Sequence, residues 1–448
     1  MLKKILKFTL AIIFIICFGI FANYFRYRFI PLVAVENHEE ISFKDIEGYT
    51  DQLSYQLFDT IKVSISAKKR GKAYITKLTK EIKVVDSFSV KETNQKYNDS
   101  LSEFGCKWSV TQSIILDSKY TPGYYTIHYK SNAMSSYSHF IIENRSASRI
   151  AVLAPLSTWV AYNNWGGKSL YKNYFEAKTV YKVSSKRPFE DPINKAESNI
   201  AEFFIKNYNA ALFPDYYLES HLNLLKDYDI IVLAYHCEYF TEDMYNNLTK
   251  LVEKDNKSLL SLGGNQIYWK TKWNSDYTVM ECRKDLTSFG NAMFDYGGMW
   301  RHHFGRSEHH LLGVRFTKSG MHSYAPYQVR KPNHWIFKNL KVDEQTIFGV
   351  TGVNELPLSG DETDKIVAQK HNMTLLAKGL NCNEQNNDYK SIESNCNKNA
   401  GADFVIIENK DHNILSTGAI ESGAGLGLDE VFTGMIMNFI EHTLSTKK

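Results

Sequence analysis

Residues 149–155 are RIAVLAP, residues 228–235 are YDIIVLAY, and residues 257–264 are KSLLSLGG. Each segment is a short, continuous apolar run, which is typical of a parallel strand buried on both faces. Between the second and third runs, Thr241 can cap the helix TEDMYNNLTKLVEKD, whose first turn is acidic. Strands that alternate with helices predict an α/β sheet with right-handed crossovers.

Further elements of this sheet are expected on either side of these runs. A helix is predicted near Asp191–Tyr208, with Pro192 in its first turn. Later, ADFVIIEN (402–409) and HNILSTGAI (412–420) are expected to form paired strands. The segment Asp429–Leu444 has the pattern of a terminal helix.

The stretch before the first apolar run has a different pattern. Alternating side chains and turn residues recur there at short spacing without a helical stripe, so we expect a β-sandwich of immunoglobulin-like size. The Cys–Trp–Cys pattern of antibody domains is absent, so only the architecture is predicted. The expected strands are IKVSIS (61–66), KAYITKL (72–78), IKVVDSFSV (82–90), WSVTQSIIL (108–116), YYTIHYK (124–130) and SHFIIEN (138–144).

The N-terminus carries an uncharged run of 18 residues, Phe8 to Phe25, with lysines before it and Arg26 and Arg28 after it. Eighteen apolar residues just cross a bilayer, and a small-residue cleavage site is missing, so an uncleaved transmembrane signal anchor is favoured over a cleaved signal. The positive flank keeps the amino end cytoplasmic and places the body in the periplasm or outside the cell. The predicted division is 1–28 anchor, 29–50 connector, 51–147 β domain and 148–448 α/β domain.

Composition narrows the function classes. The 448 residues are 43% hydrophobic and 23% charged, which excludes a disordered chain and a polytopic membrane protein. The net charge of +4 misleads, because five basic residues and no acid lie in the first 28 residues: Lys3, Lys4, Lys7, Arg26 and Arg28. The rest of the chain is close to −1, so no nucleic-acid partner is expected.

Two of the six cysteines, Cys382 and Cys396, flank a polar, asparagine-rich loop. In an oxidising compartment a disulfide between them would close this loop, although the sequence also allows two free thiols. No CxxC pair indicates a zinc ribbon.

The predicted site lies at the ends of the three apolar strands. Ligands of open α/β sheets bind beyond the carboxyl ends of the strands. The loops there, 156–171, 235–240 and 263–269, are rich in aromatic and polar residues. If the strands are neighbours, one cleft gathers Trp159, Tyr162, Asn163, Asn164, Trp165, His236, Glu238, Tyr239, Asn265 and Trp269.

Two enzyme mechanisms are open from these residues, and each residue also has a structural explanation. Glu238 and tyrosine phenolates could hold a hard metal ion, with His236 moving a proton or orienting the substrate. Alternatively, Cys237 could be a nucleophile on a strand-to-helix turn, although its bulky neighbours are wrong for such a turn. The structural explanations are that the tryptophans pack in the core, that Asn265 is a turn residue and that Glu238 stabilises the N-terminus of the following helix.

Two further stretches contain residue types that are common in functional sites. MWRHHFGRSEHHLLGV (299–314) is rich in histidine but lacks the HExxH spacing of zinc enzymes, so a cleft-lining or surface loop is the default. Its arginines, Arg301 and Arg306, could contact an anionic group. LSGDETDK (358–365) is expected to be a solvated acidic loop unless it serves the cleft.

Several of these strings occur together in one known family. APLSTWVAYNNWGGKSLY, SSKRPF (184–189), YHCEYFT and GGNQIYW, followed by SGDETDK, resemble the carboxy-terminal region of the large (β) subunit of N,N-dimethylformamidase. The resemblance covers roughly residues 120–445. It implies an immunoglobulin-like domain followed by a domain like class I glutamine amidotransferases. It also implies an iron held by two tyrosines and a glutamate, and amide hydrolysis by metal-activated water.

The resemblance assigns roles residue by residue. Glu238 matches the glutamate ligand, Tyr162 one tyrosine ligand, His236 a catalytic histidine, Asn265 a substrate-pocket asparagine and Glu362 an additional catalytic acid. For the second tyrosine the candidates are Tyr124, Tyr125 and Tyr171, of which Tyr125 is taken as the ligand. The chain departs from the family at Cys237, in its predicted anchor and in showing no sign of a small partner subunit.

The leading hypothesis is therefore a membrane-anchored, extracytoplasmic, metal-dependent hydrolase of an amide or related C–N bond, with iron as cofactor and a small amide-like molecule as substrate. One alternative is a non-catalytic module that binds a glycan or envelope ligand on Trp159, Trp165 and Trp269. Another is a structural envelope protein that works through its β domain. Self-association into a homo-oligomer stays open.

Overall fold

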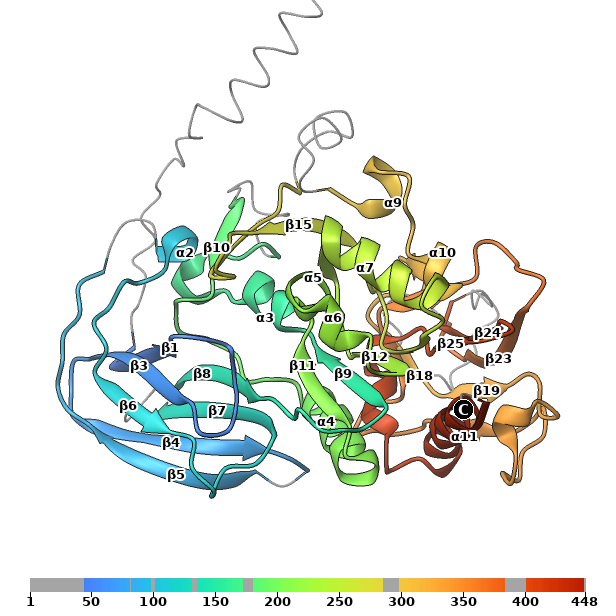
Figure 1. Cartoon of the computed structure of the whole chain (residues 1–448), viewed down its shortest axis with the longest axis horizontal. Helices are drawn as coiled ribbons and strands as arrows, with labels where there is room; N and C mark the ends of the chain where they lie inside the picture. The colour runs from blue at the N-terminus through green and yellow to red at the C-terminus, as the bar shows by residue number, and fades with distance from the viewer. Residues whose placement is uncertain are drawn as a thin grey trace, which may run out of the picture.

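The computed structural model describes residues 44–80, 82–97, 101–130, 135–171, 180–284, 298–382 and 400–446. A β-sandwich forms one end of the molecule, and a larger body built on a mixed sheet forms the other (Figure 1). The sandwich comes first in the chain, and the loops of the larger body carry the residues that the sequence marks as a site.

The sandwich consists of a three-stranded sheet, order β1-β3-β6, and a five-stranded sheet, order β2-β8-β7-β4-β5. Their bounds are β1 Ile46–Thr50, β2 Ser54–Tyr55, β3 Thr60–Ala67, β4 Gly71–Leu78, β5 Lys83–Val90, β6 Gln112–Ile115, β7 Gly123–Lys130 and β8 Ser135–Ile142. Ile61 and Val63 from the first sheet share one apolar core with Ile75, Ile127 and Phe140 from the second. The strands predicted in this region are confirmed, although β6 is shorter than expected.

A nine-stranded sheet, order β11-β9-β12-β14-β25-β24-β23-β19-β20, forms the centre of the larger body. The first five strands in this order are parallel, and the remaining ones pair antiparallel. The bounds are β9 Ile150–Ala154, β11 Ala211–Pro214, β12 Ile230–Ala234, β14 Ser258–Leu262, β19 Tyr327–Val329, β20 Ile347–Phe348, β23 Met373–Gly379, β24 Asp403–Glu408 and β25 Asn413–Ser416. The three apolar runs at residues 149–155, 228–235 and 257–264 thus contain the neighbouring strands β9, β12 and β14.

Helices pack on both faces of this sheet. Successive side chains of each strand point to opposite faces, so a continuous apolar run needs cover on both. Val152 and Val232 lie in the core that includes α4, whereas Leu153 and Leu233 lie in the core that includes α7. The helices are α2 Leu101–Phe104, α3 Leu156–Tyr162, α4 Lys195–Tyr208, α5 Tyr217–Ser220, α6 Leu222–Leu225, α7 Glu242–Glu253, α9 Trp300–His303, α10 His309–Leu312 and α11 Glu430–Thr446, with short 3-10 turns η1 Trp165–Gly167, η3 Trp335–Phe337 and η4 Ile420–Gly425.

The first residues of two helices, α7 and α4, are set by the capping residues before them. Thr241 caps α7 as predicted, since its side chain accepts from the Met244 amide at 3.2 Å. The predicted helix near Asp191 begins only at Lys195, where Asn194 accepts from the Ala196 amide. An asparagine cap satisfies a free amide, which Pro192 cannot do.

Three smaller sheets fold over the carboxyl ends of the parallel strands and hold the loops there. One has order β10-β16-β15-β13, and the others pair β17 with β22 and β18 with β21. Their bounds are β10 Lys182–Ser184, β13 Tyr239–Thr241, β15 Trp269–Trp273, β16 Val279–Glu281, β17 Arg315–Thr317, β18 Ser323–Ala325, β21 Ser359–Asp361 and β22 Thr363–Lys365. The SGDETDK segment therefore forms β21 and β22, which pair with β18 and β17 and are mostly buried, and it was wrongly expected to be a solvated loop.

The predicted fold class needs correction. An α/β domain of glutamine amidotransferase type behind an N-terminal transmembrane helix was expected, but the described part of the chain is mostly β, with several mixed sheets. The apolar runs predicted the parallel strands. The antiparallel strands and the small sheets have weaker sequence patterns, so they were not predicted, and they make the β content higher than expected.

The predicted anchor and the membrane location based on it are also corrected. Across the described ranges, no helix combines the length and apolarity needed to cross a membrane. The predicted span, residues 8–25, lies outside the described residues. Among the cysteines, Cys382 is disulfide-bonded, and its predicted partner Cys396 also lies outside the described residues.

One buried acid makes the stability of this fold depend on pH. Glu197, in the first turn of α4, is 6% exposed and accepts a hydrogen bond from Trp159 Nε1 at 2.7 Å. Burial raises the pKa of Glu197 from its ordinary 4.5 to about 8, although the Trp159 hydrogen bond opposes this. The folded chain therefore keeps a proton that the unfolded chain releases, and stability falls as pH rises through that interval.

Glu197→Gln cannot ionise, so its stability is expected to equal that of the wild type near pH 5. At pH 9 the variant should be more stable, by on the order of 3 kcal/mol. Denaturant unfolding of both proteins at the two pH values measures the difference. Identical pH profiles for the two proteins would show that Glu197 ionises freely in the fold.

Candidate functional site

Polar side chains meet at the carboxyl ends of β9, β12 and β14. Tyr162 ends the helix that follows β9, His236 and Glu238 follow β12, and Asn265 follows β14. The Tyr162 hydroxyl lies 3.0 Å from His236 Nε2 and donates to Glu238 Oε2 at 2.6 Å. His236 Nε2 also lies 3.4 Å from Glu238 Oε2. The convergence expected from the three strand ends is thus present in the structure.

Asn265 joins a second carboxylate to the first. Its side-chain amide donates to Glu362 Oε2 at 2.8 Å and to Glu238 Oε1 at 3.4 Å. Glu362 stands between β21 and β22, which pair with β18 and β17 respectively. The Asn265 side-chain oxygen is buried and has no hydrogen-bond partner among the described residues. An acceptor of this kind is costly to bury unless something binds it.

Strained backbone surrounds these residues. Tyr235, Asn265, Ile267 and Asp361 all have positive φ, between 47° and 59°. Each adjoins or is a site residue, and left-handed conformations of non-glycine residues cost about 1–3 kcal/mol. Gly263 is required here, because a Cβ at this position would lie 1.4 Å from the Tyr235 carbonyl oxygen.

A buried glutamine holds the strained turn after β12. Gln266 accepts from the Cys237 amide at 2.6 Å and donates to the Tyr235 carbonyl at 2.7 Å. Thr158 adds a second clamp, since its hydroxyl donates to the His236 carbonyl and accepts from the Glu238 amide. Both residues fix where His236 and Glu238 point, and sequence reasoning missed both.

The orientation of His236 follows from its other ring nitrogen. Nδ1 lies 2.9 Å from the Gly264 carbonyl oxygen, which can only accept, so Nδ1 carries a proton. Nε2 is then the nitrogen that faces Tyr162 and Glu238. A chain of hydrogen bonds runs from the imidazole through the phenol to the carboxylate.

The electrostatics of the site are strongly coupled. Burial alone would lower the pKa of His236, but the hydrogen bond and charge of Glu238, with the charge of Glu362, raise that pKa to about 9. Burial works to raise the pKa of Glu238, yet the hydrogen bond and charge of His236 leave that pKa below its ordinary value. Burial raises the pKa of Glu362 to about 7, against the pull of His236. Two carboxyls with separated pKa values are typical of acid–base sites.

The second tyrosine of the site is Tyr171. Its ring centroid lies 4.7 Å from that of Tyr162, and its side chain is 39% exposed. Burial raises the pKa of Tyr171, and the charges of Glu362 and Glu238 raise it further. Tyr171 lies in the same strand-end loop as Tyr162, which is the signal that could have singled it out.

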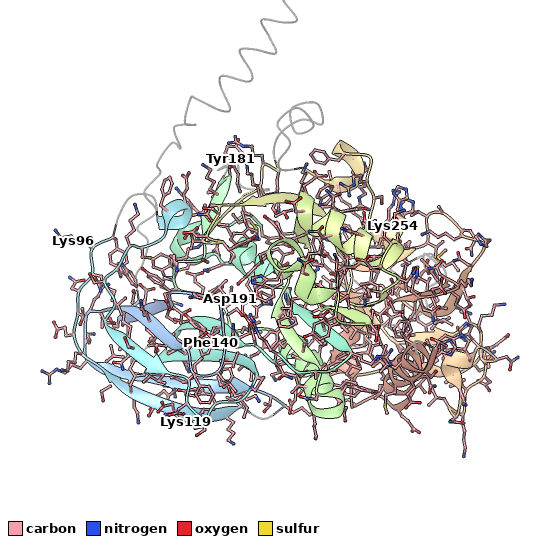
Figure 2. All side chains as sticks on the ribbon, viewed as in Figure 1. Lys96, Lys119, Phe140, Tyr181, Asp191 and Lys254 are labelled. Carbon is pink, nitrogen blue, oxygen red and sulfur yellow. The ribbon has the colours of Figure 1, made fainter. Side chains whose placement is uncertain are left out.

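Tyr125, the predicted second ligand, lies elsewhere. It is fully buried in the sandwich core, where it stacks on Phe140 at 5.4 Å and donates to the Thr121 carbonyl at 2.7 Å. Figure 2 labels Phe140 within the sandwich. Tyr124 packs edge-on against Trp159, and its hydroxyl has no partner among the described residues. Strand β7 alternates between the two cores, so Tyr125 lies in the core of the sandwich, whereas Tyr124 lies in the core against which Tyr162 packs.

The tryptophans and the cysteine of the predicted cleft are structural. Trp159, Trp165 and Trp269 are 8%, 2% and 6% exposed, which leaves no open face for stacking a sugar. Trp165 donates to Glu47 Oε1 at 2.8 Å and so links the larger body to the sandwich. Cys237 is fully buried, and burial raises the pKa of its thiol well above the ordinary value, which argues against a nucleophile.

The geometry decides which groups could hold a metal. Among the residues that the structure describes, no three His, Cys, Asp or Glu side chains are grouped so that they could hold a metal ion, and this includes the histidine-rich stretch. A metal in this site therefore needs phenol oxygens beside Glu238. The 2.6 Å between Tyr162 and Glu238 oxygens is close to the roughly 3 Å that separates neighbouring oxygen ligands of a small hard cation. Tyr162 and Glu238 supply such a pair of oxygens, and the ring of Tyr171 packs against that of Tyr162.

Comparison with known proteins adds a family. Residues 71–433 match the profile of the family described as N,N-dimethylformamidase beta subunit-like, C-terminal. The matched span contains all the residues of the site from Tyr162 to Glu362. No curated protein matches the chain significantly.

Proposed function

The chain belongs to the N,N-dimethylformamidase β-subunit-like, C-terminal family, and on that premise we propose that it is a metal-dependent hydrolase of an amide or related C–N bond. The observation that carries the proposal is the cluster of Tyr162, His236, Glu238, Asn265 and Glu362 at one sheet edge. Two buried carboxyls, an imidazole and a phenol in mutual contact are a set suited to hydrolysis.

The proposed cofactor is iron, held by Tyr162, Tyr171 and Glu238. These oxygen donors are hard ligands, and phenol protons would be displaced on binding, as metal ligands must be deprotonated. When bound, such an ion supplies Lewis acidity, which polarises a carbonyl and lowers the pKa of water. Tyr125, which the resemblance offered as a ligand, has no part in this proposal.

The other residues would handle protons and orient the substrate. His236, fixed by Gly264 through Nδ1, presents Nε2 to the cluster and can hold or release a proton there. Glu362 can act as the acid that protonates a departing amine, because its pKa near 7 lets it carry a proton at neutral pH. The unpartnered Asn265 oxygen can accept an amide N–H of the substrate.

The experiment is an assay of amine release from N,N-dimethylformamide, N-methylacetamide and N-acetylglycine. We expect the iron-loaded protein to hydrolyse at least one of these amides. A chelator should abolish the activity, and added iron should restore it. Turnover that is indifferent to metal removal would contradict the metal dependence, and no turnover of any amide by the loaded protein would contradict the hydrolase.

A further inference from the structure

Lys284 places a positive charge beside the proposed active site. It follows β16, and its ammonium donates to the Tyr239 hydroxyl at 2.5 Å. The same ammonium lies 4.8 Å from the centroid of the Tyr239 ring and 4.5 Å from that of Trp269. Tyr239 in turn packs edge-on against Tyr162, with ring centroids 5.9 Å apart. Lys284 is therefore one aromatic ring away from the cluster.

The ammonium of Lys284 has no carboxylate partner in the described part of the chain, where no acid oxygen lies within 4.0 Å of it. Its charge nevertheless reaches the site, since it helps to lower the pKa of Glu238. Burial lowers the pKa of Lys284 itself, against the pull of Glu238, Cys282 and Glu362. An ammonium donates three hydrogen bonds, and Tyr239 accepts only one of them.

Neighbouring cations differ from Lys284 in this respect. Arg187 is fully buried, but it donates to carbonyl oxygens of the surrounding loops, including those of Trp165 and Asn163. Arg301 pairs with Glu308 at 3.2 Å, and Lys270 pairs with Glu242. Their charges serve the fold, whereas that of Lys284 has no carboxylate partner among the residues that the structure describes.

We propose that Lys284 binds the carboxylate of the substrate, and that the substrate class is an amide bearing a nearby carboxylate, such as an N-acylated amino acid. The inference rests on the proposed function. A cation that lies against the Trp269 ring and donates to the Tyr239 phenol is already oriented, so binding an anion requires little further ordering. A charge-assisted hydrogen bond of this kind discriminates strongly against a neutral analogue, which would leave the ammonium unpaired.

The test compares N-acetylglycine with N-methylacetamide, which differ only by the carboxylate. Binding by calorimetry and kcat/KM for hydrolysis are measured on the iron-loaded wild type, Lys284→Met and Lys284→Arg. The wild type should favour N-acetylglycine, and Lys284→Met should reduce that preference by about 10- to 100-fold. Lys284→Arg should keep most of it. Lys72→Met is the control, because Lys72 also lies over a ring, that of Tyr74 at 5.1 Å, but in the sandwich.

The outcomes separate this inference from the hydrolase proposal. A Lys284-dependent binding preference without turnover of either amide would support the role of Lys284 and contradict the hydrolase. Hydrolysis with equal losses for both amides in Lys284→Met would show that Lys284 only supports Tyr239 or Glu238, and would overturn the inference. Equal binding of both amides by the wild type would overturn it as well. Thermal unfolding of each variant verifies that the fold is retained.

Discussion

Glu238→Gln is expected to lower kcat/KM for amide hydrolysis at least about 1,000-fold while the protein remains folded. Glu238 contacts most residues of the site. Its carboxylate accepts from Tyr162 and lies beside His236. The Asn265 amide donates both to Glu238 and to Glu362. Glutamine keeps the shape but removes the charge that would bind a cation and that stabilises the protonated imidazole. Loss of a charged group that acts on the reacting atoms typically costs about 3–4 kcal/mol or more.

A buried glutamate of the sandwich offers a matched control for this variant. Glu143 is 6% exposed, accepts from the Tyr217 hydroxyl at 2.7 Å and pairs with Arg145 at 2.9 Å. Glu143→Gln should therefore disturb stability as much as Glu238→Gln, yet leave kcat/KM within about twofold. Glu238→Gln with nearly normal turnover, or equal losses in both variants, would contradict the role given to Glu238.

His236→Gln is expected to lower kcat about 100- to 10,000-fold, which is the range for losing a general acid or base. Iron content should stay at the wild-type level, because His236 is not among the proposed ligands. This combination distinguishes a residue that moves a proton from one that holds the metal. Elemental analysis and steady-state kinetics on the same preparation measure both quantities.

The control for this variant is His139→Gln. His139 is 2% exposed and, like His236, places a ring nitrogen against a backbone carbonyl, that of Asp191 at 2.8 Å. It belongs to the sandwich, so its loss should affect stability and leave kcat unchanged. If His236→Gln loses iron together with activity, His236 is a ligand or an essential support of one, and the assignment is wrong.

The ends of the three apolar strands predicted most of the candidate site from sequence. Continuous apolar runs are strong signals, and parallel neighbours must bring their carboxyl ends to one edge, so Tyr162, His236, Glu238 and Asn265 could be grouped. Glu362 lies far along the chain between β21 and β22, and only the family resemblance pointed to it. No local periodicity tells which distant strands two such short strands will pair with.

The second tyrosine shows the limit of reasoning from motifs. Tyr125 was chosen from PGYY, but alternation along β7 sends it into the sandwich core. Tyr171 packs against Tyr162 in the structure, and it belongs to the loop that already carries Tyr162. Contacts within one loop are the more predictable ones, since contacts between domains depend on packing that sequence patterns do not report.

The roles of Gln266 and Thr158, and the fold class, could not be predicted from the sequence for a related reason. Gln266 is an ordinary polar residue until its two hydrogen bonds to the turn after β12 are seen. The antiparallel half of the main sheet is built from short strands such as β19 Tyr327–Val329 and β20 Ile347–Phe348. Strands of two or three residues are held by their neighbours and leave almost no pattern of their own.

The most direct test of the proposed metal site is the iron content of the purified protein after reconstitution, compared with that of the Tyr162→Phe/Tyr171→Phe double variant. Both phenylalanines keep the ring packing and remove only the phenol oxygens. The wild type should hold about one iron per chain and the double variant almost none, with similar unfolding temperatures. A wild type that binds no iron, or a double variant that binds as much as the wild type, would contradict a metal site built on these tyrosines and Glu238.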